Sequence, residues 1–232
     1  VPSTFFPKEP ILTNYTKVWN TIGFGTLFQN STLIVLVKTG LILYTSAITG
    51  FVISKVDFKY NNAVFILVLC TMMIPWPITI IPMYQEMVWF GWINSYLSII
   101  IPYMFSAFGI YMMKQFIDTI PNELLEAAKI DGASDYTIFH RIIISNIKSA
   151  LSALGIFQFL WVWDDFLWPF LMIQEPSKYT LPLGLRSLTG QFYSDYGPIL
   201  AGATISVMPV LLVYIIFQKQ FVEGIVMSGM KD

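Results

Sequence analysis

Residues 114–148 read KQFIDTIPNELLEAAKIDGASDYTIFHRIIISNIK, a polar stretch that separates two long apolar ones. The run 121–123, Pro-Asn-Glu, is typical of a helix start, because Pro and acidic residues favour the first turn. Gly132 suits the positive φ that ends a helix, and Ser134 suits the N-cap of a second helix over 135–144. The stretch therefore predicts two short amphipathic helices hinged at Gly132. From this pattern alone, the hairpin either lies on a membrane surface or docks into a partner protein.

The composition outside this stretch is that of a membrane protein. Of 232 residues, 56% are hydrophobic and 12% charged, whereas soluble domains average about 45–50% apolar and about 25% charged residues. The net charge of −1 provides no field that would recruit nucleic acid. Cys70 and His140 are the only residues of their kinds, which excludes a disulfide within the chain and a multi-histidine metal site. We expect an all-α integral membrane protein.

Five stretches are long and apolar enough to be transmembrane helices of about 20 residues. They are approximately residues 31–53, 63–83, 96–113, 149–173 and 198–217, in a single transmembrane domain over 1–232. The prolines at 75, 77 and 82 predict that the second span is kinked or irregular.

The distribution of Lys and Arg predicts the orientation of these spans. With the N-terminal segment outside, the inner side holds eight basic residues, which are Lys55, Lys59, Lys114, Lys129, Arg141, Lys148, Lys219 and Lys231. The outer side then holds Lys8, Lys17, Lys178 and Arg186. The positive-inside rule favours this arrangement, with 114–148 as a cytoplasmic loop. Since an external start needs a way across the membrane, we expect a further helix before Val1.

The wording of the loop resembles a known family. Glu126-Ala127-Ala128 followed by Asp131-Gly132-Ala133 resembles the EAA loop of permeases in binding-protein-dependent ABC importers, and the string 130–134, IDGAS, resembles the carbohydrate-uptake (MalG-type) branch. The strings MMIPWPITIIPMY (72–84), WDDFL (163–167) and TLPLGL (180–185) resemble other segments of that branch, in the same order. The chain departs from the family at Ile144-Ser145, where Leu-Pro is usual, at Ser149, where Pro is common, and at Asp164, where Asn is usual.

The resemblance implies a type I importer permease in a bacterial or archaeal inner membrane. It implies as partners a second permease subunit, two cytoplasmic ATPase subunits and an external solute-binding protein that delivers a sugar. The EAA residues Glu126, Ala127, Ala128, Asp131, Gly132 and Ala133 would couple this subunit to the ATPases. The chain lacks the G-x-x-x-x-G-K-[ST] string that binds nucleotide phosphates, so ATP and Mg²⁺ are expected on those partners, with no cofactor and no enzymatic activity on this chain.

Charged and aromatic residues within the predicted spans are candidates for the substrate path. They are Trp76, Gln158, Trp161, Trp163, Asp164 and Asp165. Aromatic rings stack on sugar C–H faces and carboxylates accept hydroxyl hydrogen bonds. Also open are an interfacial tryptophan belt, ordinary packing of Trp76, and an Asp165 that caps a bend or pairs with Lys or Arg of the partner. Lys38 lies within the first span, where it either snorkels or pairs with an acid of a partner.

Two other functions remain open from the sequence. One is an ABC permease for a non-sugar solute such as an amino acid, a polyamine or phosphate. The other is a secondary transporter without ATPase subunits, which would require inverted repeats or charges in several spans. No convincing internal repeat is visible.

Overall fold

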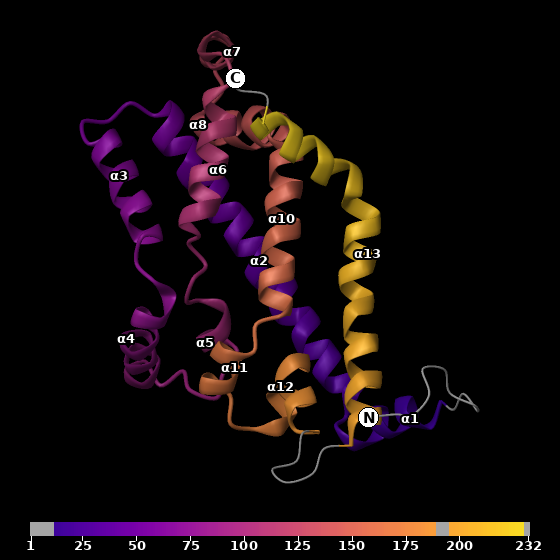
Figure 1. The fold of residues 1–232 in the computed structure, drawn as a ribbon. Coiled ribbons are helices and arrows are strands. Elements are labelled where there is room, and N and C mark those ends of the chain that lie inside the picture. The colour runs from indigo at the N-terminus through magenta and orange to yellow at the C-terminus, as the bar shows by residue number, and fades with distance from the viewer. Residues whose placement is uncertain (1–11, 189–194, 230–232) are drawn as a thin grey trace.

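The computed structural model describes residues 12–188 and 195–229, with side chains described as far as Gln218. These residues form helices joined by turns, with no strand among them (Figure 1). Lys8 and Lys231, which the charge count above used, lie outside the described residues, as does the side chain of Lys219. We call the two ends of the molecule the α7 end, at the top of Figure 1, and the α4 end, at the bottom.

The long helix α2 (Phe24–Lys55) runs between the two ends and is the centre of the fold. It contains the first predicted span, 31–53, and begins seven residues earlier than predicted. Three helices pack along it directly or through a neighbour: α6 (Ala107–Asp118), α10 (Lys148–Trp163) and α13 (Tyr196–Gly229). The fifth predicted span, 198–217, lies within α13. The short helix α1 (Thr13–Thr21) packs beside the start of α13 at the α4 end.

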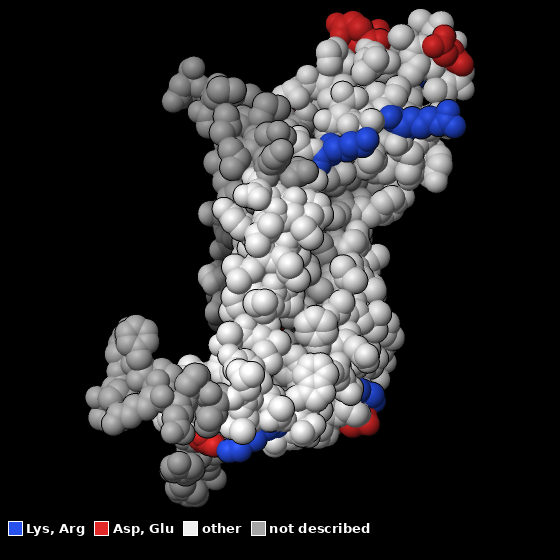
Figure 2. Space-filling view, turned by 90° about the vertical axis from the view of Figure 1, so that its right-hand side faces the viewer, with Lys and Arg blue, Asp and Glu red and all other residues white. Residues whose placement is uncertain are grey.

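Charged side chains gather at the two ends, with an uncharged band between them on the face that Figure 2 shows. Within the described residues, two helices are long and apolar enough to cross a membrane, namely Phe24–Lys55 and Tyr196–Gln218. Two bent helix pairs raise the total to four if each pair is one span. The first is 61–89, bent by 100°, and the second is 135–163, bent by 78°.

The second predicted span, 63–83, is two helices rather than one. Helix α3 (Asn61–Met72) ends before Pro75, and α4 (Trp76–Trp89) begins after it and lies across the α4 end. The predicted proline interruption is therefore confirmed. Pro75 takes the N-cap of α4 and Pro77 lies in its first turn, where a missing N–H costs no helical hydrogen bond. Pro82 stays inside α4.

A continuous helix over 96–113 was a wrong prediction. Helix α5 (Leu97–Ile100) is one turn long, and α6 begins only at Ala107. Pro102 lies in the intervening segment, Tyr103 has a positive φ of 63°, and the Ser106 hydroxyl accepts the Gly109 N–H at 3.0 Å as the N-cap of α6. With 12 residues, α6 spans about 18 Å, which is less than the roughly 30 Å of a bilayer core.

The fourth predicted span, 149–173, is also broken. Helix α10 ends at Trp163, and α11 (Leu167–Met172) follows after a three-residue gap. The Asp165 carboxylate accepts the Trp168 N–H at 3.3 Å across this gap. A 3₁₀ turn (Pro176–Lys178) and α12 (Leu181–Arg186) then lead back toward α13 at the α4 end.

The polar stretch 114–148 forms the α7 end. It contains α7 (Asn122–Ile130), α8 (Asp135–Thr137), a π-helical segment (Ile138–Ile143) and α9 (Ile144–Asn146). Its two predicted helices and their Gly132 hinge are confirmed, but the π-helical turns were not predicted. The chain bends by 78° at Ile147 into α10, although the usual prolines of this region are absent from the sequence.

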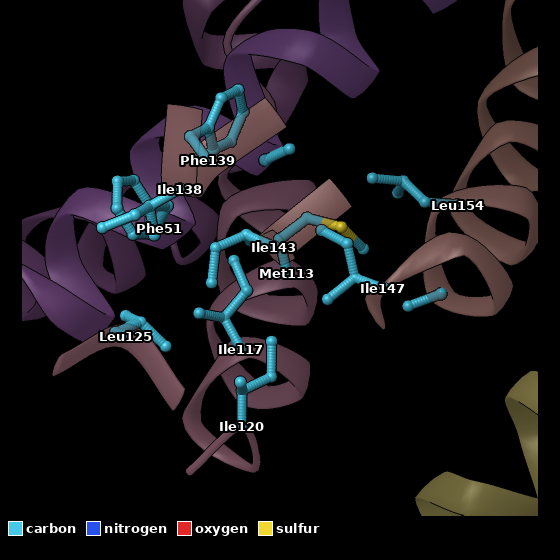
Figure 3. Packing of buried hydrophobic residues seen from close by; sticks show 12 residues of the cluster. Phe51, Met113, Ile117, Ile120, Leu125, Ile138, Phe139, Ile143, Ile147 and Leu154 are labelled. Atoms are coloured by element: carbon cyan, nitrogen blue, oxygen red, sulfur yellow. The ribbon is translucent and has the colours of Figure 1, made fainter. Parts of the chain in front are cut away.

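Buried side chains of the α7 end form one cluster, which we call the α7-end core (Figure 3). It unites helices that are far apart in the sequence. Its members are Ala47, Phe51, Met113, Ile117, Ile120, Leu125, Ile138, Phe139, Ile143, Ile147, Ala150 and Leu154. Two further clusters fill the α4 end and the contact between α2, α10 and α13.

Close backbone approach of α2 and α6 at Gly50 leads to a first prediction. A Cβ at Gly50 would lie 2.9 Å from Met113 Cβ and 3.0 Å from the Lys114 backbone nitrogen. Gly50→Ala should therefore force the helices apart and lower stability by about 1–3 kcal/mol, the usual cost of overpacking. Thermal unfolding of the detergent-solubilised protein measures this.

Gly40→Ala is the matched control in the same helix, since a Cβ there meets no atom within 4 Å. Ala also favours helix more than Gly does, so its melting temperature should stay level or rise. Equal melting temperatures for Gly50→Ala and Gly40→Ala would contradict the close approach.

Candidate translocation cavity and coupling helix

A cavity of about 1210 Å³ lies between the bent pair α3–α4 and the helices α2, α6 and α10. Four of the six sequence-predicted path residues line it: Trp76, Gln158, Trp161 and Asp165. They come from the start of α4, the second half of α10 and the gap after α10. The structure thus brings together residues that are about 90 positions apart in the chain.

Hydrogen bonds fix several of the polar groups in this cavity. The Gln158 amide donates to the Ser106 hydroxyl at 3.3 Å, and the hydroxyls of Thr79 and Tyr103 lie 3.5 Å apart. Because the Ser106 hydroxyl also accepts the Gly109 N–H, the start of α6 holds the Gln158 side chain in place. These groups present fixed donors and acceptors beside the rings of Trp76, Trp161 and Tyr103.

The structure places Trp163 and Asp164 outside the cavity, against the sequence prediction. Trp163 is 5% exposed, stacks on Phe159 and donates from Nε1 to the Ser206 carbonyl oxygen of α13 at 3.1 Å. Asp164 is exposed at the C-cap of α10. Successive helical positions differ by about 100°, so Trp163 faces away from the side of the helix that presents Trp161.

Two cavity residues were not among the predicted path residues. Lys38 was expected to snorkel or to pair with a partner, and Tyr103 was not considered. Lys38 lines the cavity and is 5% exposed, with its ammonium 5.9 Å from the centre of the Tyr103 ring. It therefore faces the cavity rather than snorkelling to an interface. A charged residue within an apolar stretch was the sequence feature that could have identified Lys38 as a cavity residue. Tyr103 gave no signal, since its position depends on the unpredicted break before α6.

Helix α7 ends in a Schellman motif, which explains the spacing of the EAA residues. Gly132, with φ of 82°, donates to the Lys129 carbonyl oxygen at 3.0 Å, and the Ala133 N–H donates to that of Ala128 at 2.9 Å. This pair of bonds forms only when the residue at the C′ position, here Gly132, takes a positive φ. The Ser134 hydroxyl then accepts the Thr137 N–H at 3.3 Å and starts α8, and Lys129 pairs with Asp135 at 3.3 Å across the turn.

One face of α7 is anchored and the other is exposed. Leu125 is buried in the α7-end core (Figure 3), and the Lys55 ammonium donates to the Ile120 carbonyl oxygen at 2.6 Å and to Asn122 Oδ1 at 2.8 Å. Glu126, Ala127 and Asp131 are exposed. So are Ile130 and Tyr136, at 86% and 71%. Figure 2 shows acidic side chains at this tip, with basic ones nearer the uncharged band.

The opposite end is tied together by Asn94, which has a positive φ of 62°. Its Oδ1 accepts the N–H groups of Gln174 and Glu175 at 3.2 and 3.1 Å, and its own N–H donates to the Met172 carbonyl oxygen at 2.7 Å. Hydrogen bonds from Lys178 and Ser177, with the Lys178 charge, lower the pKa of the exposed Glu175 carboxyl to about 2. Glu175 is therefore ionised at any physiological pH.

Comparison with known proteins identifies the family. Residues 43–226 match the family model described as "Binding-protein-dependent transport system inner membrane component". The chain belongs to this family, whose members are inner-membrane permease subunits of ABC importers.

Individual relatives agree over nearly the whole chain. The chain is 33% identical to the arabinooligosaccharides transport system permease protein AraQ of Halalkalibacterium halodurans over 228 residues, 98% of this chain and 82% of that protein. It is 32% identical to the lactose transport system permease protein LacG of Rhizobium radiobacter, over 87% of this chain and 74% of that one.

A solved structure shares the fold. It is the crystal structure of a bacterial ABC transporter involved in the import of the acidic polysaccharide alginate. The match has a TM-score of 0.85 at 22% identity and covers 93% of this chain and 81% of that one. The all-helical type I permease fold expected from the sequence is thereby confirmed.

The contrasting environments of two tryptophans give a second prediction. Trp163→Ala should lower stability by about 3 kcal/mol or more, because it empties a packed site and removes the donor to Ser206. Trp161→Ala, at a side chain that is 57% exposed, should change the melting temperature little. Thermal unfolding of the two variants side by side makes the comparison, and equal losses would contradict the assignment of Trp163 to the packed side of α10.

Proposed function

We propose that this permease subunit moves a sugar, specifically a di- or oligosaccharide, that an external solute-binding protein delivers. The observation that carries the proposal is the cavity between the broken α3–α4 pair and the helices α2, α6 and α10, with aromatic rings beside fixed polar groups. Rings of Trp76 and Trp161 offer faces on which sugar C–H groups stack, while Gln158 and Asp165 offer hydroxyl partners. The names of the relatives, which include arabinooligosaccharide and lactose permeases, support the same solute class.

A second, related permease subunit closes the open side of the cavity in this proposal. No residue of α3 is buried, and α4 buries only Met87. Large apolar side chains on this flank are strongly exposed, including Leu67, Met73, Ile78 and Ile81. Lipid or protein must cover such a surface. A protein subunit would also enclose the polar groups that line the cavity, to which lipid tails offer no hydrogen-bond partner.

Two ATPase subunits bind ATP and Mg²⁺ and receive α7 in this proposal. The exposed Glu126 supplies a charge for polar contacts in an ATPase cleft, and the exposed small side chain of Ala127 permits close backbone approach. Asp131, Gly132 and Ala133 set the angle between α7 and α8 through the Schellman turn, in which Ala128 is the acceptor. Closure of the ATPases would move α7 and, through Leu125, the α7-end core.

The relatives leave the charge of the solute open. An arabinooligosaccharide is an uncharged sugar, whereas the transporter in the solved structure is involved in the import of an acidic polysaccharide. A non-sugar solute is the alternative that the test below separates.

Uptake by the reconstituted transporter tests the solute class. With the cognate binding protein and ATPase subunits in proteoliposomes, we expect ATP-dependent uptake of labelled oligosaccharides. Uptake of amino acids, polyamines or phosphate should be absent. Uptake of one of these solutes, without uptake of any sugar, would refute the sugar proposal.

The Schellman turn provides a test of the coupling role. Gly132→Val places a β-branched residue at a φ of 82°, which costs at least about 1–2 kcal/mol locally. We expect roughly tenfold less ATP-dependent uptake and weaker ATPase co-purification, because the angle of α7 changes. Glu126→Arg, which leaves the backbone unchanged, should also weaken co-purification.

Gly23→Val is the matched control for the backbone effect. Gly23 has a φ of 61° and, like Gly132, has no atom within 4 Å of an added Cβ, but it lies at the start of α2, at the end far from α7. This variant should keep ATPase co-purification. Normal uptake and co-purification in Gly132→Val and Glu126→Arg would refute the role of the EAA residues.

A further inference from the structure

Lys38 is a buried cation that faces the cavity in the middle of α2. It is the only charged residue of α2 before the terminal Lys55. Its ammonium makes no hydrogen bond, and no ion pair within 4.0 Å, with any residue that the structure describes. The Tyr103 ring lies beside it, with 5.9 Å from Nζ to the ring centre. Charges inside a membrane are costly and mark functional sites. We therefore expect this ammonium to interact with a ligand in the cavity.

Asp165 is the second charged residue of the cavity wall. Of the described residues that line the cavity, only Lys38 and Asp165 carry charged side chains. Asp165 comes from the gap between α10 and α11, where its carboxylate accepts the Trp168 N–H at 3.3 Å. Both residues line the same cavity, yet no ion pair within 4.0 Å joins them. The cavity wall therefore carries one cation and one anion that form no ion pair with each other.

This separation specifies the chemistry of a ligand. An ammonium only donates hydrogen bonds and an ionised carboxylate only accepts them. A hydroxyl group does both, so neighbouring hydroxyls satisfy the two side chains at once. A carboxylate or phosphate group would satisfy Lys38 but would be repelled by the like charge of Asp165.

We propose that Lys38 and Asp165 together bind neighbouring hydroxyl groups of an uncharged sugar and select against sugars that carry a carboxylate or a phosphate. The inference rests on the proposed sugar transport and adds the charge of the solute to it. Trp76, Trp161 and Tyr103 provide the apolar faces around the pair. Gln158, held by Ser106, provides a further neutral donor and acceptor.

The competing explanation is a structural ion pair that holds α2 against the α10–α11 gap. The two explanations differ in what a double substitution does. If the pair is structural, Lys38→Met with Asp165→Asn removes both charges and relieves the imbalance that either single change creates. If the pair binds solute, the double variant loses both recognition groups and stays defective.

Uptake of labelled arabinotriose tests this in proteoliposomes that contain the complete transporter and its binding protein. Each single variant and the double variant should assemble with the partner subunits. At subsaturating concentrations of sugar-loaded binding protein, their uptake should be roughly tenfold lower, since each charged hydrogen bond contributes about that factor. Lys38→Arg, which keeps a cationic donor, should retain most of the uptake. Restored uptake in the double variant would overturn the inference.

Solute charge is tested by direct binding to the complete transporter in nanodiscs without the binding protein. Tryptophan fluorescence reports titration with arabinotriose or with trigalacturonate. The unsubstituted transporter should prefer arabinotriose, and Asp165→Asn should shift the preference toward trigalacturonate by roughly tenfold, since it leaves the wall positive. Equal or tighter trigalacturonate binding by the unsubstituted transporter would overturn the inference.

The outcomes separate this inference from the proposed function. Sugar uptake that none of the substitutions changes would refute the role of the pair and leave sugar transport standing. Uptake of a non-sugar solute alone would refute both.

Discussion

The α7-end core is the contact on which the other parts of the structure depend, because it attaches a short, exposed helix to the long helices. Helix α7 has nine residues, and helices of that length are not stable alone in water. Leu125 fixes it, as a buried member of the α7-end core (Figure 3). Lys55 fixes its start by hydrogen bonds to Ile120 and Asn122. The outer face of α7 can therefore be polar and exposed without losing its position.

The cavity depends on a different constraint. Every backbone N–H and C=O group at membrane depth needs a hydrogen-bond partner. Irregular backbone there is tolerated only where it is buried in protein or borders a cavity. The three breaks in the predicted spans lie at 73–75, 101–106 and 164–166. Each contributes to the cavity wall or directly precedes a residue that does: Trp76 follows the first, Tyr103 and Ser106 lie in the second, and Asp165 lies in the third. The departures from regular helix are concentrated around the candidate site.

The sequence predicted those elements whose cause is local. The hinge at Gly132 and the cap at Ser134 follow from single residues whose backbone requirements are known, and the apolar runs of α2 and α13 are long enough to be seen in composition. The interruption at Pro75 is local in the same sense. Family membership was likewise predictable, because it depends on a string of residues and their order.

Elements that depend on packing between distant segments were not predictable. A window of apolar residues does not reveal whether a helix is continuous, so the break between α5 and α6 was missed despite Pro102. The opposite orientations of Trp161 and Trp163 depend on which side of α10 meets α13. The π-helical turns at Ile138–Ile143 accompany the burial of Ile138, Phe139 and Ile143 against α2 and α6, which no local pattern encodes.

The candidate cavity and the candidate coupling helix, α7, are linked by the same three helices. Helix α2 carries Lys38 in the cavity and Phe51 in the α7-end core. Helix α6 begins beside Ser106 in the cavity wall and carries Met113 and Ile117 into the core. Helix α10 runs the other way, from Ala150 and Leu154 in the core to the cavity.

Close-packed helices shift as units rather than deforming continuously. In the proposed coupling, a displacement of α7 would therefore reach the cavity wall along all three helices. Such a displacement would separate those side chains of the cavity wall that lie on different helices or segments. Lys38 is on α2, whereas Asp165 is in the gap beyond α10. A solute bridging the two would be held in one arrangement of the helices and released in another, which is the physical requirement for coupling solute movement to the ATPase cycle.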